Sequence, residues 1–239
     1  MISLRQKIES RYRDRVQQFE QSPEFRQLES GKAPPEFYRT FITNVCTTHL
    51  KSPQILAFIY AAAPPAVALT VQHNLLEELG LDEAWVSHPT LLRQLATAAG
   101  FTSQELLQLE NAAQAELKRL CAAPLLYGTL KEFGLAVLLE VTSFEWMLSR
   151  LAERMGRALQ SHAGLGTEEL AWFFHHGEVD CRHAEEGLDT VVEYIRYYEV
   201  ALEEVEMILD ITFREDIFHK RYFAASGAIA APVEVALLS

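Results

Sequence analysis

The residues best suited to chemistry lie in one short segment, His176-Gly-Glu-Val-Asp180-Cys-Arg-His183. Successive residues of an α-helix turn by about 100°, so side chains three or four positions apart project from one stripe. Two imidazoles and a carboxylate on such a stripe can chelate a transition metal. The spacing of His176, Asp180 and His183 therefore predicts a metal site, and a chance polar surface stripe is the alternative. His175 projects about 100° away from His176, so we do not expect it to share the metal.

A second group of candidate ligands stands where one expected helix ends and the next begins. Glu77 and Glu78 come just before Gly80, a natural helix C-cap, and His88-Pro89 opens the following helix. Two-metal sites in helical bundles take inward-facing carboxylates from facing helices, together with histidines spaced by helical turns. Glu77, Glu78 and His88 are therefore candidates for further ligands.

Two more carboxylates, Glu140 and Glu145, stand in the otherwise apolar stretch Phe133–Leu151. A carboxylate in such a setting is costly unless it is paired, protonated or bound to a metal. Five helical positions separate the two residues by about 140°, so we expect only one of them to face the site. The other reading for either residue is a salt bridge to Arg150 or Arg154, or simple exposure to solvent.

The elements that must position these residues are all expected to be helices. Strand-like alternation is scarce and hairpin turn signals are absent, so the sequence predicts an all-α fold. We expect one domain over residues 1–239, a bundle of about seven helices with a tail after about residue 218 that is irregular. Breaks at glycine and proline predict the helices. Six have both ends marked, at about Ser3–Glu20, Glu36–Ser52, His88–Gly100, Thr102–Ala123, Thr167–Glu186 and Leu188–Phe213. Two more are expected to end at Gly80 and at Arg157.

Composition narrows the class of protein. The chain has 239 residues, 49% of them hydrophobic, and a formal net charge of −12. It has no Lys/Arg stripe, which argues against nucleic acid as a partner, and no apolar run that suits a membrane span. Its three cysteines do not suit a disulfide framework, and its charged N-terminus is unlike a signal peptide. We therefore expect a cytoplasmic protein that acts on a small molecule, as a homodimer.

These motifs resemble those of the haem-oxygenase-like di-iron oxidases and oxygenases, whose scaffold is similar to that of the TenA-type and pyrroloquinoline-quinone-synthase proteins. The resemblance is carried by Asn74–Gly80 with the following His88-Pro89, by a glutamate on a mid-chain helix, and by the segment Trp172–Gly187. It spans about Leu69–Asp189. The resemblance implies a haem-oxygenase-like helical domain that binds two Fe(II) ions and uses O2 as co-substrate.

The resemblance also implies which residues hold the two ions. Glu145 takes the mid-chain position because it follows an aromatic residue, Phe144, and stands at the family's usual distance before the last motif. Glu140 is the reserve for Glu145, and Glu77 is the reserve for Glu78. The implied ligand set is Glu78, His88, Glu145, His176, Asp180 and His183.

The substrate implied by the resemblance is an amino acid whose carbon–carbon bond is cleaved with O2. Over the whole chain, the similarity is to a nitrile-forming branch that converts a brominated tryptophan to indole-3-carbonitrile. A substrate carboxylate needs a cation near the irons, for which Lys118 and Arg119 are candidates, and Phe144 is a candidate for the pocket wall. An oxidative decarboxylase of a fatty-acid-like substrate and a metal-free, TenA-like binding protein remain as alternatives.

Overall fold

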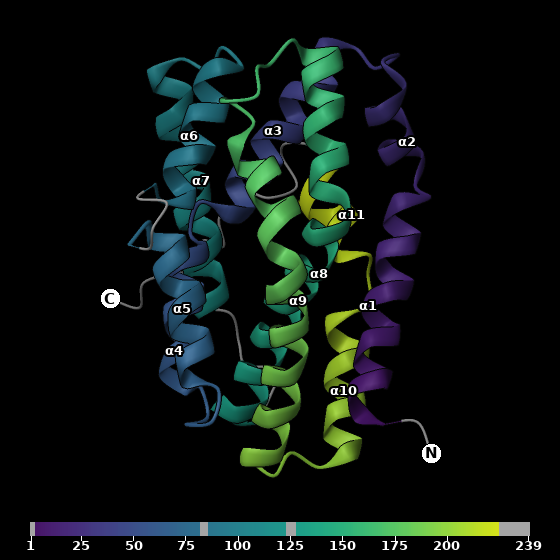
Figure 1. Cartoon of the computed structure of the whole chain (residues 1–239), viewed down its shortest axis with the longest axis vertical. Coiled ribbons are helices and arrows are strands. Elements are labelled where there is room, and N and C mark those ends of the chain that lie inside the picture. Colours follow the sequence, from purple (N-terminus) through teal and green to yellow (C-terminus); the bar gives the residue numbers. More distant parts are fainter. Residues whose placement is uncertain (1–2, 82–85, 123–127, 225–239) are drawn as a thin grey trace, which may run out of the picture.

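The structure is a computed structural model that describes residues 3–81, 86–122 and 128–224, without the side chains of residues 121, 122 and 178–181. The described residues form helices and no strand, which confirms the all-α prediction (Figure 1). In chain order the helices are α1 Leu4–Glu20, α2 Pro23–Ser30, α3 Pro35–His49, α4 Ser52–Ala62, α5 Ala68–Leu79, α6 His88–Ala98, α7 Ser103–Ala122, α8 Leu130–Ala163, α9 Ala171–Tyr197, α10 Leu202–Thr212 and α11 Ile217–Tyr222. These are more than the expected seven or so, partly because α2 and α11 are short helices that the sequence pattern does not reveal.

The two longest helices, α8 and α9, pack against each other through the middle of the bundle, and the remaining helices surround them (Figure 1). The expected break at Gly187 is wrong, because α9 continues through this residue to Tyr197. Gly187 instead allows α8 to come close, since a Cβ atom there would lie 2.9 Å from Cγ2 of Thr142. The chain turns only at residues 198–201, where Glu199 has a φ of 48°.

Helix ends near the candidate ligands agree with the prediction. Gly80 caps α5 in the left-handed conformation with a φ of 67°. The α6 helix begins at His88, and the side chain of Ser87 caps it by accepting a hydrogen bond from the amide of Thr90. These two ends place Glu77 and Glu78 in the last turn of α5 and His88 at the first position of α6.

The C-terminal helix α11 is anchored inside the bundle. The expectation of an irregular tail after about residue 218 is wrong as far as Tyr222, and residues 225–239 lie outside the described residues. The buried side chain of Asn44 in α3 donates to the carbonyls of Tyr222 and Ala224, at 3.0 and 2.9 Å. Phe218 packs its ring edge-on against Phe144 of α8.

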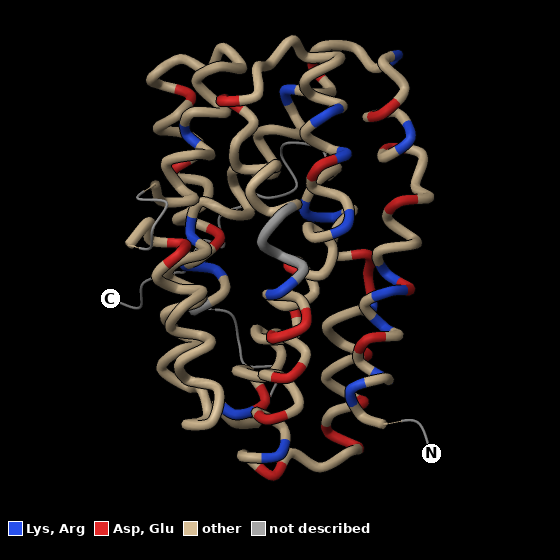
Figure 2. Tube along the Cα trace, in the orientation of Figure 1, with Lys and Arg blue, Asp and Glu red and all other residues tan. Residues whose placement is uncertain are grey.

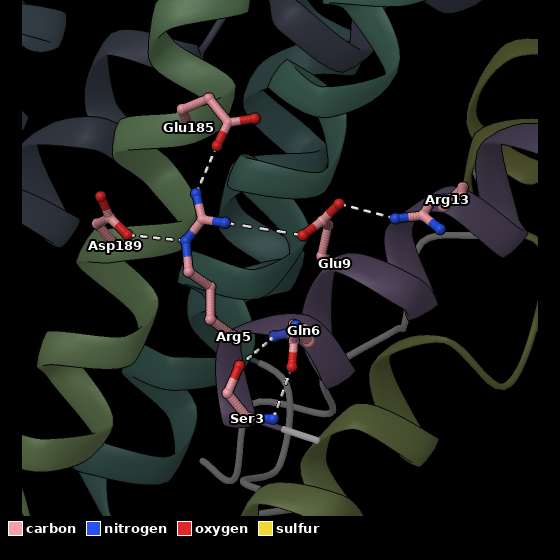
Figure 3. A network of polar contacts seen from close by, with 7 residues as sticks. All are labelled: Ser3, Arg5, Gln6, Glu9, Arg13, Glu185 and Asp189. Atoms are coloured by element: carbon pink, nitrogen blue, oxygen red, sulfur yellow. Dashed lines mark hydrogen bonds and ion pairs between the residues drawn. The ribbon is translucent and has the colours of Figure 1, made fainter. Parts of the chain in front are cut away.

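Charged side chains are unevenly distributed over the bundle. Arg5 of α1 forms ion pairs with Glu185 and Asp189 of α9 (Figure 3). Lys, Arg, Asp and Glu are absent from residues 52–76, which cover α4 and most of α5, whereas α1, α9 and α10 carry many (Figure 2). In the described part of the chain, no helix is both long and apolar enough to cross a membrane.

Replacement of Asn44 by alanine is expected to loosen α11. The change leaves two carbonyls of the C-terminal segment without their side-chain donor, and an unsatisfied buried polar group costs about 1–3 kcal/mol. We expect the free energy of unfolding, measured by chemical denaturation, to fall by about 2 kcal/mol or more. Thr43→Ala is the matched control, because within the described residues the Thr43 hydroxyl bonds only to the carbonyl of Arg39 one turn back. Equal stability of the two variants would contradict this role of Asn44.

Candidate metal centre

One buried cluster joins the C-terminal end of α5 and the N-terminal end of α6 to the second turn of α9. Glu78, His88 and His176 are all buried, and each offers a ligand atom within 4.8 Å of the others. Oε1 of Glu78 lies 2.9 Å from Nδ1 of His88. The left-handed turn at Gly80 makes this possible, because its missing side chain lets the backbone of Ser87 approach to a point only 2.4 Å from where a Cβ would stand.

His176 is held in the form that binds metals. Its Nδ1 lies 2.6 Å from the carbonyl oxygen of Trp172, which can only accept, so Nδ1 carries the proton. The lone pair is therefore on Nε2, the usual arrangement of a metal-binding histidine with a backbone acceptor behind it. Burial, and then the nearby imidazole of His88, lower the pKa of His176 well below its ordinary value, so the ring stays neutral.

Glu78 is held as a carboxylate. Burial raises the pKa of its side chain, but the imidazole of His88 and the hydroxyl of Ser52 outweigh burial and bring the pKa below the ordinary value. Oγ of Ser52 donates to Oε2 of Glu78 at 2.5 Å, which leaves Oε1 beside His88. His49 lies in the same wall, and burial lowers its pKa to about 3, so it adds no positive charge at neutral pH.

A second group of acid and imidazole lies next to the first. Nε2 of His183 is 2.6 Å from Oε2 of Glu77, and both side chains are buried. The contact lacks the alignment of a hydrogen bond, because Oε2 of Glu77 accepts none in the described part of the structure. Arg182, half exposed, lies 3.1 Å from the other oxygen of Glu77. The structure thus pairs His183 with Glu77, which sequence reasoning kept only as the reserve for Glu78.

The mid-chain carboxylates both face the interior. Glu145 accepts a hydrogen bond from Asn74 at 2.6 Å and lines two adjoining cavities together with His183. Glu140 lines the larger of these cavities and accepts from Arg221 at 3.0 Å. Both line one cavity, but Glu140 pairs with Arg221 there, so the expectation that only one of them would face the metal site is not contradicted. Both fit because their separation along α8 lets them reach different parts of one large cavity.

Expected partners of these carboxylates differ from those observed. Glu140 pairs with Arg221, whereas Arg150 lies over the ring of Trp146 and Arg154 pairs with Glu20 and Glu29. The side chain of Asp180, the remaining member of the expected ligand set, lies outside the described residues.

The donor atoms suit non-haem iron. Two imidazoles and one carboxylate that leave other coordination positions open form the ligand set typical of Fe(II) oxygenases, and Glu78, His88 and His176 supply it. His183, Glu77 and Glu145 offer the same donor types beside it. The residues present therefore fit one iron ion well, and they offer ligands for a second.

The cavity that reaches these residues has a volume of about 110 Å³. Its walls are mainly apolar and come from α4, α7 and α8, with Phe144 among them. Lys118 and Arg119, the cations expected near a substrate, are exposed and do not line this cavity. Its cations are instead Lys51 and Arg221.

Comparison with known proteins identifies the family. Residues 39–210 match a family described as iron-containing redox enzymes, and the match includes every candidate metal ligand. The chain belongs to this family. It is therefore related to oxidoreductases that use iron, and the expectation of iron is confirmed at that level. A search of curated proteins gave no match.

A solved structure shares the fold. It is a domain of unknown function with a haem-oxygenase-like fold from Shewanella denitrificans, and it is 18% identical in sequence with a TM-score of 0.58. The similarity covers 92% of this chain and 88% of that one. The predicted haem-oxygenase-like fold is therefore confirmed.

Sequence reasoning missed several polar residues of the cavity, among them His49, Ser52 and Arg221. The first two stand at the junction of α3 and α4, three positions apart, and this spacing was the available signal that they share a face. Arg221 gave no local signal, because its position in the cavity depends on how α11 docks on α3, α7 and α8.

Substitution of Gly187 by alanine is expected to disturb Glu145, one of the candidate ligands for a second ion. The new methyl group would lie 2.9 Å from Cγ2 of Thr142 and 3.3 Å from Oε2 of Glu145. Overpacking of this kind costs about 1–3 kcal/mol. We expect a lower midpoint of thermal unfolding and a loss of bound iron, measured by metal analysis.

Gly177→Ala is the matched control on the same helix, because its methyl group would meet Cβ of Glu153 at an ordinary 3.4 Å. We expect this variant to be as stable as the unmodified protein, or slightly more so, since alanine favours a helix. If both variants keep the same stability and the same iron content, the close approach at Gly187 does not position Glu145.

Proposed function

We propose that this protein is a non-haem di-iron enzyme, an O2-dependent oxygenase or oxidase that acts on an amino acid with cleavage of a carbon–carbon bond. The observation that carries the proposal is the convergence of Glu78, His88 and His176 in the core of the bundle. The family match supports iron and redox chemistry. The pairing of Glu77 with His183 beside this cluster supports a second ion.

Each residue has a definite part in the proposal. Glu78, His88 and His176 hold the first ion, and His183 and Glu145 hold the second together with Asp180, which the sequence motif supplies. Glu77 lies beside His183 and would be a further ligand. When bound, two Fe(II) ions supply the electrons that activate O2.

The surrounding side chains keep these ligands in place. Ser52 donates to Oε2 of Glu78, so the other carboxylate oxygen is directed to His88. The carbonyl of Trp172 fixes the tautomer of His176, and the Trp172 ring lies against the His176 ring with centroids 4.3 Å apart. Arg182 offsets the charge of Glu77 from the solvent side. Such outer partners commonly change metal affinity by about 10–100-fold.

The cavity supports a substrate with an apolar part. Its apolar wall includes Ile55, Leu117, Leu120, Val137, Val141 and Leu148, and the same cavity is lined by the candidate ligands. A C–H or C–C bond of the substrate can therefore lie beside the ions while water is kept away. Conversion of a brominated tryptophan to indole-3-carbonitrile stays a prediction that rests on the sequence resemblance.

Removal of a ligand from the first cluster is expected to abolish iron binding there. The purified chain is incubated with Fe(II) without oxygen, desalted, and its iron content per chain is measured. We expect His176→Ala and Glu78→Gln to lose at least one ion, with a loss of affinity greater than the roughly 10–100-fold of an outer partner. His219→Ala is the control, because His219 pairs with Glu24 at the surface.

The number of iron ions bound per chain distinguishes a single-iron site from a di-iron site. We expect His183→Ala and Glu145→Gln to lose the second ion while the first remains. Consumption of O2 by the iron-loaded protein, measured with an oxygen electrode, should require both ions and an amino acid. Full iron content in His176→Ala would refute the proposed centre, and a single ion per chain in the unmodified protein would refute its di-iron form.

A further inference from the structure

A second polar group lines the same cavity at a place that the metal ligands do not use. It consists of Arg221 of α11, Glu140 of α8 and Glu116 of α7. Nη2 of Arg221 donates to Oε1 of Glu140 at 3.0 Å, and Nη1 lies 3.5 Å from Oε2 of Glu116. The three side chains are 15–32% exposed. They therefore present charge to a cavity whose walls are otherwise mainly apolar.

The charges of this group nearly balance. Arg119 pairs with Glu116 from the outer surface at 2.9 Å, so the order is Arg119, Glu116, Arg221, Glu140, with alternating sign. Burial lowers the pKa of Arg221, but the two carboxylates outweigh burial and raise the pKa above its ordinary value. Arg221 and Glu140 thus face the cavity as a cation and an anion side by side.

Within the described residues, Arg221 has N–H donors that Glu140 and Glu116 do not use. A guanidinium group carries several N–H donors in a planar fork. Among the described residues, Arg221 forms one hydrogen bond, to Glu140, and one longer ion contact, to Glu116. A carboxylate that enters the cavity can therefore bind to the fork without displacing Glu140.

The position of Arg221 is rigid. The next residue, Tyr222, is fully buried, and its hydroxyl lies 2.7 Å from Nε2 of His49. Asn44 holds the backbone of the same turn through the carbonyls of Tyr222 and Ala224. A side chain fixed in this way loses little conformational freedom on binding, which favours affinity.

The adjacency of one cation and one anion selects the class of ligand. A fatty acid would bring a carboxylate to Arg221 and would also face the negative charge of Glu140. An α-amino acid carries its carboxylate and its ammonium group on the same carbon atom, so it can pair with both side chains at once. Its side chain can then contact the apolar wall that includes Leu117, Val137 and Val141.

We propose that Arg221 and Glu140 are the substrate-binding pair of this cavity and that they recognise the carboxylate and the ammonium group of an α-amino acid. This inference rests on the proposed function, because it assigns the substrate of the same site. Glu116 is a positioning residue, since it holds Arg221 from the other side. Glu140 lies within residues 39–210, the part that matches the family, whereas Arg221 lies beyond it.

The test compares ligands that differ by one charged group. The full chain is loaded with Fe(II) without oxygen, and binding is measured by calorimetry for a panel of common L-amino acids and for L-bromotryptophan. Each amino acid that binds is compared with its deaminated acid and its decarboxylated amine, for example L-tryptophan with indole-3-propionate and tryptamine. We expect the amino acid to bind at least about tenfold more tightly than either analogue.

Variants test the two residues separately. We expect Arg221→Gln to raise the dissociation constant of the amino acid by about 10–100-fold and to leave the iron content unchanged. We expect Glu140→Gln to weaken binding of the amino acid. The same change should leave binding of the deaminated acid as tight as before, or tighter. A merely structural ion pair would not produce this pattern. Arg119→Gln is the matched control, because it removes a guanidinium group that pairs with Glu116, as Arg221 does, but from outside the cavity.

The outcomes separate this inference from the proposed function. If the panel does not bind, if the analogues bind as tightly as the amino acids, or if both Arg221→Gln and Glu140→Gln behave like Arg119→Gln, the assignment is wrong, whatever the iron content. If the unmodified protein takes up no iron but the iron-free chain binds amino acids through Arg221, the proposed redox function fails and the binding pair stands. Unfolding temperatures identify any variant that has lost its fold, and Arg221→Lys then takes the place of Arg221→Gln.

Discussion

The constraint on which the rest of the structure depends is the burial of carboxylates and imidazoles inside a helical bundle. Glu77, Glu78, His88, His176 and His183 are all buried, although the interior around them is apolar. Burial of an ionised group costs several kcal/mol unless opposite charges and hydrogen bonds offset it. The contacts between these residues give part of that compensation. A cation held among them would provide the rest, which is why so many polar groups can share one core.

The positions of these residues at helix ends also disfavour their charged forms. The carbonyl end of a helix carries partial negative charge and the amide end carries partial positive charge. Glu77 and Glu78 stand in the last turn of α5, and His88 is the first residue of α6, so each group is at the end that destabilises its charged form. For stability alone this placement is unfavourable by some tenths of a kcal/mol per residue. For a bound cation it is favourable, because the negative potential of the α5 carbonyl end and of the two carboxylates gathers on one side of the site.

The parts of this arrangement that depend on helical period could be predicted from sequence. His176 and His183 lie on one buried stripe because spacing along a helix is a local property, and Gly80 and His88 mark helix ends for equally local reasons. The role of Gly187 could not be predicted, since a glycine that breaks a helix and one that admits a neighbouring helix look alike in sequence. The pairing of Glu77 with His183 was also out of reach, because neighbouring helical residues point in different directions and only the packing decides what each one meets.

Under the proposed function, the chemistry and the choice of ligand belong to different parts of the fold. The candidate metal ligands come from α5, α6, α8 and α9, all within the residues that match the family. The charged pair that faces the cavity comes from α8 and α11, and α11 lies beyond that match. The short helix α11 docks through Asn44 and Phe218, and its Tyr222 contacts His49, which packs against Trp172 beside His176. Under the proposed function, the residues that select the substrate lie apart from those that hold the metal, so residue types near the metal indicate the reaction better than they indicate the ligand.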